Sequence, residues 1–305
     1  MGCFMEATIF GLSAYLGLLI LAGSLTLGAM TASFLEEASF GLGRGKFRDK
    51  LGGQFAAMGV KGLLCLVLLL VPAAVWLASL VPDPLAWCES LSDSAAGEGL
   101  LPLLAGWLGM TIYSGSWAGL GRKKWLHRIL GGLSLLALLA GTYGGMNVLW
   151  DWTPGGGLPE ASSWKAMWYP AAWSIWPAWI ALVSNGIGAA GILGTGYLLL
   201  RRNRDDFGRD YYRFALARSA RWGLVLILPV LITAGWLALR GLTGLALLPC
   251  AAAGLAALAS VWLALRLIRS RHPLRLKGSV LLACLLAWLL DAALVLSLLW
   301  AVWSV

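Results

Sequence analysis

The stretch "CLLAWLLDAALVLSLL", residues 284–299, decides the class of this protein, because it is apolar apart from Asp291 and Ser297. It lies inside a longer apolar segment, 279–303, and about 20 such residues are enough to carry a helix across a bilayer. A carboxylic acid near the middle of a membrane helix is costly to bury, so it is usually kept for a function or for a contact between helices. Asp291 is therefore the first candidate functional residue.

The composition of the whole chain agrees with a membrane location. Of its 305 residues, 60% are hydrophobic and 12% are charged, whereas soluble domains carry about 25% charged residues. No run shows the strict alternation of a membrane β-barrel strand. We predict an all-α integral membrane protein with eight transmembrane helices, near residues 7–35, 60–81, 100–120, 128–150, 172–200, 222–239, 243–268 and 279–303.

The basic residues predict the orientation of these helices. Of 23 Lys and Arg, 21 fall in four patches that follow odd-numbered spans or lie at the starts of even-numbered ones, and only Lys165 and Arg240 lie on the other side. The four basic patches are 44–61, 122–128, 201–221 and 266–277. Because basic residues gather on the cytoplasmic side, we predict a protein of the bacterial inner membrane with both termini periplasmic. The net charge of +9 then reflects orientation and anionic headgroups rather than a nucleic-acid partner.

A weak internal repeat divides the chain. A shift of 160 positions places Phe47 on Phe207 and aligns two Trp-Leu-Ala triplets, and the loop between the halves is rich in Gly, Pro and Trp. Two parallel four-helix repeats would produce this pattern. The predicted division is a first four-helix bundle at 1–150, a periplasmic linker at 151–172 and a second four-helix bundle at 173–305.

Two basic segments, 43–62 and 201–223, interleave charged and aromatic residues before an apolar span. Such segments are typical of helix starts at the lipid headgroups, and a docking surface for a cytoplasmic partner is the alternative. The run "GIGAAG", 186–191, matches the dinucleotide pattern G-x-G-x-x-G but lies inside an apolar segment with no preceding strand. We interpret its small residues as a place where helices pack closely.

The candidate haem ligands on this chain are its two histidines, His127 and His272, which occupy similar places before even-numbered spans. A bis-histidine haem b would need both rings to face the interior of a bundle. Their basic surroundings are more typical of solvated interface residues, so we do not expect haem b on this chain. No C-x-x-C-H motif is present for covalent haem c, and we predict no metal site.

Four stretches resemble subunit I of the cytochrome bd-type quinol oxidases. They are "GSLTLGAMTASFLEE" (23–37), "FRDKLGGQFAAMGVKG" (47–62), "GEGLLPLLAGWLGMTIYSGSWAGLGRKK" (97–124) and "ILGTGYLLLRRNRDDFGRDYYRFALARSARWG" (192–223). The resemblance implies that Glu37 matches the acidic residue that ends the family's first helix, and that Glu98 matches a family carboxylate. It also implies a membrane subunit of the respiratory chain.

The departures from that family are equally informative. Leu19 and Trp179 stand where the family has haem-ligating histidines, and the long quinol-binding loop and the Gly-Arg-Gln-Pro-Trp motif are absent. Leucine has no donor atom for iron, and the indole nitrogen has no free lone pair. The sequence therefore does not support oxygen reduction by this chain alone.

These features favour a haem-poor membrane subunit of a respiratory electron-transfer complex. It would interact with quinone or scaffold a haem-bearing partner, either a second integral subunit or a periplasmic cytochrome c or other redox protein. The alternatives are a quinone-handling anchor of a molybdenum or iron–sulfur oxidoreductase, a small-molecule transporter, and a structural subunit without a ligand. The proton or quinone candidates are Asp291, Glu98 and Glu37.

Asp291 has a predicted helix face and predicted partners. Ala283 and Ala287 precede it at steps of four, so small residues share its face and would let another helix approach. We therefore expect the acid to point into the protein rather than to lipid. The polar residues that could meet it are Tyr113, Thr142, Tyr143, Asn147, Ser184 and Asn185.

Overall fold

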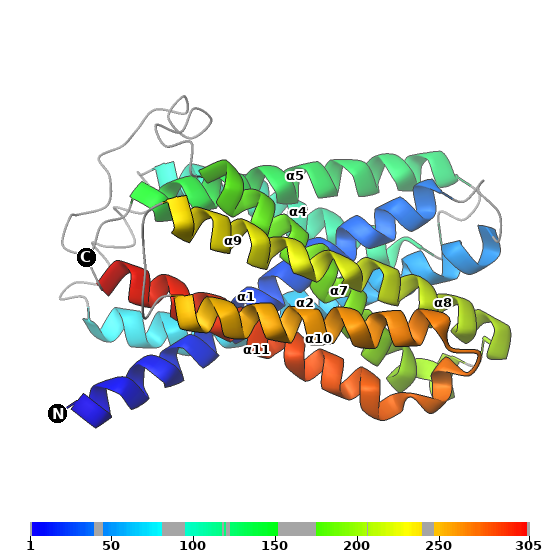
Figure 1. Ribbon diagram of the computed structural model, residues 1–305. Coiled ribbons are helices and arrows are strands. Elements are labelled where there is room, and N and C mark those ends of the chain that lie inside the picture. The colour runs from blue at the N-terminus through cyan, green and yellow to red at the C-terminus, as the bar shows by residue number, and fades with distance from the viewer. Residues whose placement is uncertain are drawn as a thin grey trace. The chain divides into compact units, whose positions relative to one another are not determined.

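A computed structural model describes residues 2–39, 45–80, 95–117, 119, 123–151, 175–205, 207–239 and 247–303 (Figure 1). All regular secondary structure in these ranges is helical. The α-helices are α1 (Gly2–Ala38), α2 (Gly45–Leu80), α4 (Ala95–Gly115), α5 (Lys124–Asp151), α7 (Ile175–Asp205), α8 (Arg209–Gly223), α9 (Ile227–Leu239), α10 (Leu247–Arg269) and α11 (Lys277–Trp303). Two 3₁₀ turns, η1 (Leu224–Leu226) and η3 (Pro273–Arg275), join neighbouring helices.

The prediction of an all-helical, multi-pass membrane protein is confirmed. Seven helical segments of the described chain are long and apolar enough to cross a membrane, and each corresponds to a predicted span. They are Phe10–Ala38, Gly45–Val75, Lys124–Met146, Trp176–Asp205, Arg209–Leu239, Leu247–Arg269 and Lys277–Trp300. The remaining predicted span, 100–120, overlaps α4, whose described apolar part, Leu100–Gly115, is shorter than these seven. Eight crossings therefore remain a prediction.

Two membrane helices begin well before their predicted spans. α2 begins at Gly45 rather than at residue 60, and the helical segment Arg209–Leu239 begins ahead of the predicted residue 222. The reason is that both basic segments are amphipathic. Their apolar faces supply Leu51, Phe55 and Tyr211 to one buried cluster, while the charged side chains lie outside it.

These helices are also longer than the bilayer requires. Gly45–Val75 and Arg209–Leu239 each contain 31 residues, which gives a length of about 46 Å at 1.5 Å per residue. The hydrocarbon core is only about 30 Å thick. The basic ends of both helices consequently reach into or past the headgroup layer.

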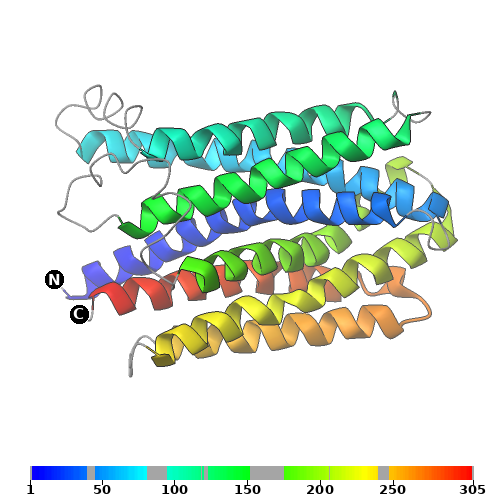
Figure 2. The same ribbon diagram turned by 90° about the horizontal axis from the view of Figure 1, so that it is seen from above.

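The helices group into two compact units. One contains residues 1–63 and 180–305, and the other contains residues 64–179. In the first unit α11 packs against α1 and α10, and α10 also packs against α8 and α9; in the second unit α4 packs along α5. The predicted division into two sequence repeats at 151–172 remains a prediction. In the described residues, α1 packs against α11. The start of α1 and the end of α11 lie at the same end of their unit (Figures 1 and 2).

Small residues let the helices of the first unit cross closely. A Cβ atom on Gly28 of α1 would overlap the carbonyl oxygen of Gly186 in α7, and one on Gly191 would overlap the backbone at Gly223. A Cβ atom on Gly17 would lie 2.7 Å from the Cα atom of Ala292 in α11. The interpretation of "GIGAAG" as a helix-packing segment is therefore confirmed, since two of its glycines form these crossings.

The predicted orientation can be tested by cysteine labelling. In a variant without the five native cysteines, a cysteine at Ser163 should react with a membrane-impermeant maleimide in intact spheroplasts. A cysteine at Arg202 should react only after lysis, because the basic patches are predicted to be cytoplasmic. The opposite pattern would show that the orientation is inverted.

Candidate functional site

Asp291 lies in the interior of the first unit. It is 14 residues after Lys277, the first residue of α11, which places it about 21 Å along the helix at 1.5 Å per residue. Its exposed fraction is 2%. Neither of its carboxyl oxygens forms a hydrogen bond of ordinary geometry with any residue that the structure describes. Ala283 and Ala287, on the same face, are 0% and 1% exposed, which confirms that this face is buried.

Two other polar side chains are buried with Asp291. Asn185 of α7 lies beside the carboxyl group and is 4% exposed, and its Nδ2 donates a hydrogen bond to the Ser24 Oγ atom of α1 over 3.3 Å. Ser24, 2% exposed, donates in turn to the Leu21 carbonyl over 3.2 Å. The Oδ1 atom of Asn185 has no hydrogen-bond partner among the described residues. We call Asp291, Asn185 and Ser24 the mid-membrane polar cluster.

The other residues predicted to meet Asp291 have different surroundings. Ser184 donates to the Ala181 carbonyl of its own helix. Tyr113, Thr142 and Tyr143 belong to the second unit. The side chain of Asn147 lies outside the described residues. Asn185 is therefore the predicted partner that the structure brings to the acid.

The mid-membrane polar cluster has unused hydrogen-bonding capacity in an apolar setting. An ionised carboxylate without a partner costs several kcal/mol to bury, so this arrangement suits a neutral carboxylic acid or an acid that meets a donor from outside the chain. A carboxyl group of this kind can hydrogen-bond a polar headgroup and can take up or release a proton. These are the two chemical tasks that the cluster can perform.

A second buried acid lies near the C-terminal end of α1. Glu36 is 0% exposed, and its Oε1 atom accepts hydrogen bonds from Arg218 Nε over 2.6 Å and from Trp222 Nε1 over 3.1 Å. The Arg218 guanidinium also lies over the Trp222 ring, 5.4 Å from its centroid. A buried carboxylate that is paired and hydrogen-bonded in this way ties α1 to α8.

Sequence reasoning selected the neighbouring acid, Glu37, and missed Glu36. Glu37 is itself buried, at 2% exposure, so both acids of the pair lie inside the protein. The signal for Glu36 was the helical spacing, because positions 29, 32 and 36 share one face and Ala29 and Ala32 are fully buried. Glu98, the third candidate acid, lies within α4, and its side chain is outside the described residues.

A further polar network joins α2, α7 and α8. The Tyr211 hydroxyl donates to Gln54 Oε1, and Gln54 Nε2 donates to Asp205 Oδ2 over 3.0 Å. Asp205 is also paired with Arg201 over 2.7 Å, and Arg201 donates to the Tyr197 hydroxyl over 3.0 Å. Each of these groups has a protein partner, so the network fixes the helix ends and leaves little capacity for a ligand.

The two histidines have surroundings that do not suit haem ligation. His127 is 4% exposed, its Nε2 atom lies 3.1 Å from the Tyr113 carbonyl oxygen, and its ring stacks on the Tyr113 ring at 4.2 Å. The Trp117 ring meets it edge-on at 4.7 Å. His272 is exposed, and its Nδ1 atom lies 3.1 Å from an Arg209 nitrogen. His127 is thus a packed interior residue rather than the solvated one that its basic surroundings suggested.

Trp179 of α7 and Leu19 of α1 are the two residues that the resemblance alone would place at haem-ligand positions. Trp179 donates its indole N–H to the Thr142 hydroxyl over 3.3 Å and meets the Tyr143 ring edge-on at 5.8 Å. Leu19 is a partly buried residue of α1. Within the described ranges, no group of three or more His, Cys, Asp or Glu is placed to hold a metal ion.

No protein-family model matches this sequence, and no curated protein matches it in a sequence search.

Proposed function

We propose that this chain is a haem-poor integral membrane subunit of a respiratory electron-transfer complex in the bacterial inner membrane. In this proposal the mid-membrane polar cluster hydrogen-bonds a quinone headgroup and exchanges a proton with it. The observation that carries the proposal is Asp291, a carboxylic acid that is 2% exposed, lies beside Asn185 and forms no hydrogen bond of ordinary geometry with any described residue. The resemblance of four stretches to a quinol oxidase subunit supports the choice of ligand.

The three side chains of the cluster would divide the work. A quinone, when bound, supplies a carrier that takes up or releases protons together with electrons. Asp291 would hold or release the proton at its carboxyl group, and Asn185 would orient that group through its free Oδ1 atom. Ser24 would fix the Asn185 amide through the hydrogen bond that it already accepts. The apolar residues around the cluster would keep water away from the exchange.

The redox centre of the complex would belong to a partner. Leu19 and Trp179 cannot bind iron, and the Nε2 atom of His127 is occupied by a backbone carbonyl. A second integral subunit that carries haem, or a periplasmic cytochrome c, would supply the electrons or accept them. This chain would then provide the quinone site and the membrane scaffold.

The experiment that tests the proposal is an Asp291→Asn substitution in the complex purified from its own membranes. Asparagine keeps the size and hydrogen bonding of the side chain but cannot titrate. We expect the variant to assemble and its quinol-linked turnover to fall at least about tenfold, which is about 1.4 kcal/mol of activation free energy. An absorption spectrum and a quinone extraction on the same preparation should show haem from the partner and bound quinone.

Ser260→Ala is the matched control. The Ser260 hydroxyl of α10 is also fully buried without a hydrogen-bond partner among the described residues, so this variant removes a similar polar group elsewhere in the membrane region. Its turnover should stay at the level of the unchanged protein. Normal assembly and unchanged turnover in Asp291→Asn would instead show that the acid only holds helices together. An active, colourless protein without quinone would favour the transporter.

A further inference from the structure

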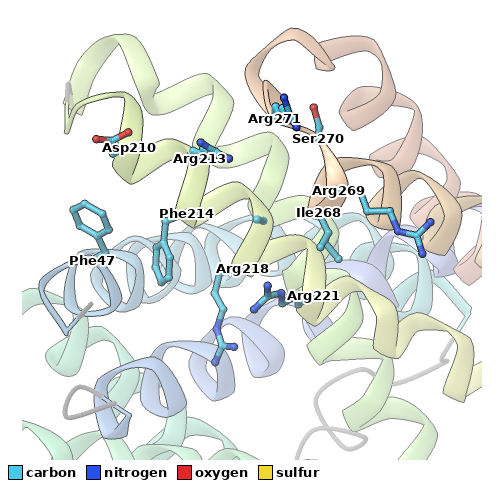
Figure 3. A pocket seen from close by; sticks show the side chains of 11 residues that line it. Phe47, Asp210, Arg213, Phe214, Arg218, Arg221, Ile268, Arg269, Ser270 and Arg271 are labelled. Atoms are coloured by element: carbon cyan, nitrogen blue, oxygen red, sulfur yellow. The ribbon is translucent and has the colours of Figure 1, made fainter. Parts of the chain in front are cut away.

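A pocket of about 630 Å³ opens in the first unit, between α8 and the end of α10, and the start of α2 contributes to it. Figure 3 shows the side chains that line it. They are Phe47, Asp210, Arg213, Phe214, Ala217, Arg218, Arg221, Ile268, Arg269, Ser270 and Arg271. The volume is within the range of about 300–1,000 Å³ that is usual for small-molecule sites.

The charge of this lining is strongly positive. The lining contains five arginines and one acidic residue, Asp210. One of the five, Arg218, is paired with Glu36. No ion pair within the described ranges neutralises the other four, which are Arg213, Arg221, Arg269 and Arg271. Subtracting Asp210 from these four leaves three positive charges for a ligand to meet.

The basic residues of the lining also indicate which class of anion it can bind. All five basic residues of the lining are arginines, and the planar guanidinium group binds phosphate oxygens through two parallel hydrogen bonds. Ser270 adds a hydroxyl group, while Phe214 and Ile268 add an apolar wall. The lining therefore fits an anion with phosphate groups next to an apolar portion.

The depth of the pocket can be derived from helix lengths. Leu239 ends α9 and is followed by Arg240, so it marks one edge of the hydrocarbon layer. Arg221 is 18 residues before it and Arg213 is 26 residues before it, or about 27 Å and 39 Å at 1.5 Å per residue. The hydrocarbon core is about 30 Å thick. Arg221 therefore lies near the edge of the hydrocarbon layer opposite Leu239, and Arg213 lies beyond that edge, in the headgroup layer. Arg269 lies at a similar height, 22 residues or about 33 Å from the start of α10 at Leu247.

We propose that this pocket binds an anion that carries at least two phosphate charges. The guanidinium groups of Arg213, Arg221, Arg269 and Arg271 bind the phosphate oxygens, and Arg218 is held in place by Glu36. The depth at the headgroup layer favours the headgroup of a diphosphate phospholipid over a soluble phosphate compound. Basic pockets between helices at this level are suited to such lipids.

Native mass spectrometry of the full chain in mild detergent tests the lipid source. The probes are tetraoleoyl cardiolipin, which has two phosphates, and dioleoyl phosphatidylcholine, which has no net charge. We expect one cardiolipin to bind tightly and phosphatidylcholine to bind weakly. The double variant Arg221→Gln/Arg269→Gln should weaken cardiolipin binding at least about tenfold, because two charge-assisted contacts are lost. Both arginines are exposed, so their substitution should leave the fold intact.

The control is Arg202→Gln/Arg204→Gln, which removes the same charge from exposed arginines in the last turn of α7. It should bind cardiolipin like the unchanged protein. Titration of delipidated protein with inorganic pyrophosphate tests the soluble source, and pyrophosphate binding that the pocket variant loses would support a phosphate site filled from solution. If neither cardiolipin nor pyrophosphate binds, the proposal is overturned. Equal losses in the pocket and control variants would overturn it as well, because they would indicate general surface charge.

Discussion

Gly28→Ala should destabilise the first unit strongly. The new Cβ atom would overlap the Gly186 carbonyl oxygen, which belongs to the backbone of α7 and cannot move by a side-chain rotation. Overpacking a core usually costs about 1–3 kcal/mol, and we expect at least the upper value here because two helix backbones would have to separate. The separation would also disturb Ser24 and Asn185, which lie next to the crossing and share a hydrogen bond. The yield of monodisperse protein in detergent and its thermal unfolding measure the effect.

Gly11→Ala provides the control for this prediction because Gly11 lies in the same helix. A Cβ atom there meets nothing within 4 Å. Alanine is favoured over glycine in a helix by about 0.5–1 kcal/mol, so this variant should be as stable as the unchanged protein or slightly more stable. Equal behaviour of the Gly28 and Gly11 variants would mean that the α1–α7 crossing is wider than described.

Arg218→Ala should have the second largest effect on stability. Without the guanidinium group, the fully buried Glu36 carboxylate loses its cation and keeps only the indole N–H of Trp222. Breaking a buried ion pair from one side costs about 3–5 kcal/mol, because the remaining charge is uncompensated. Adding Glu36→Gln removes that charge, so the double variant should recover at least half of the loss.

Unfolding of the single and double variants in detergent, monitored as a double-mutant cycle, measures the coupling of this pair. Arg202→Ala, at an exposed position of α7, should change stability by less than about 0.5 kcal/mol. A double variant that is no more stable than Arg218→Ala would show that Arg218 acts through its packing on Trp222 instead of through its charge.

The sequence predicts the helices well because long apolar runs have one stable form in lipid. All seven spans recognised in the described chain were predicted, and the small residues in "GIGAAG" and at Ala283 and Ala287 were correctly placed at buried helix contacts. The starts of α2 and α8 were not predicted, because these segments are amphipathic and their many charged residues interrupt the apolar run. Their apolar face becomes buried only when the two segments meet each other and α1.

The candidate sites were harder to predict. The cost of burying a lone acid singles out Asp291, but Asn185 was one of six possible partners and Ser24 was not considered at all. Residues 24, 185 and 291 come from three helices, and no local pattern shows that those helices meet. Glu37 was selected through the family resemblance, and nothing near it in the sequence points to Glu36, because the partner of Glu36, Arg218, lies 182 positions further along the chain.

That separation also has a consequence for how the protein is made. Ribosomes add about 5–20 residues per second, so the 182 residues between Glu36 and Arg218 correspond to about 10–40 seconds of synthesis. During this interval α1 is already made while α8 does not yet exist, and α11, which packs on α1, is made later still than α8. The second unit, residues 64–179, is continuous in sequence and can pack as it leaves the ribosome. The first unit can close only after α11 has been made, and until α8 has been made the acidic residue of α1 stays in the membrane without its basic partner.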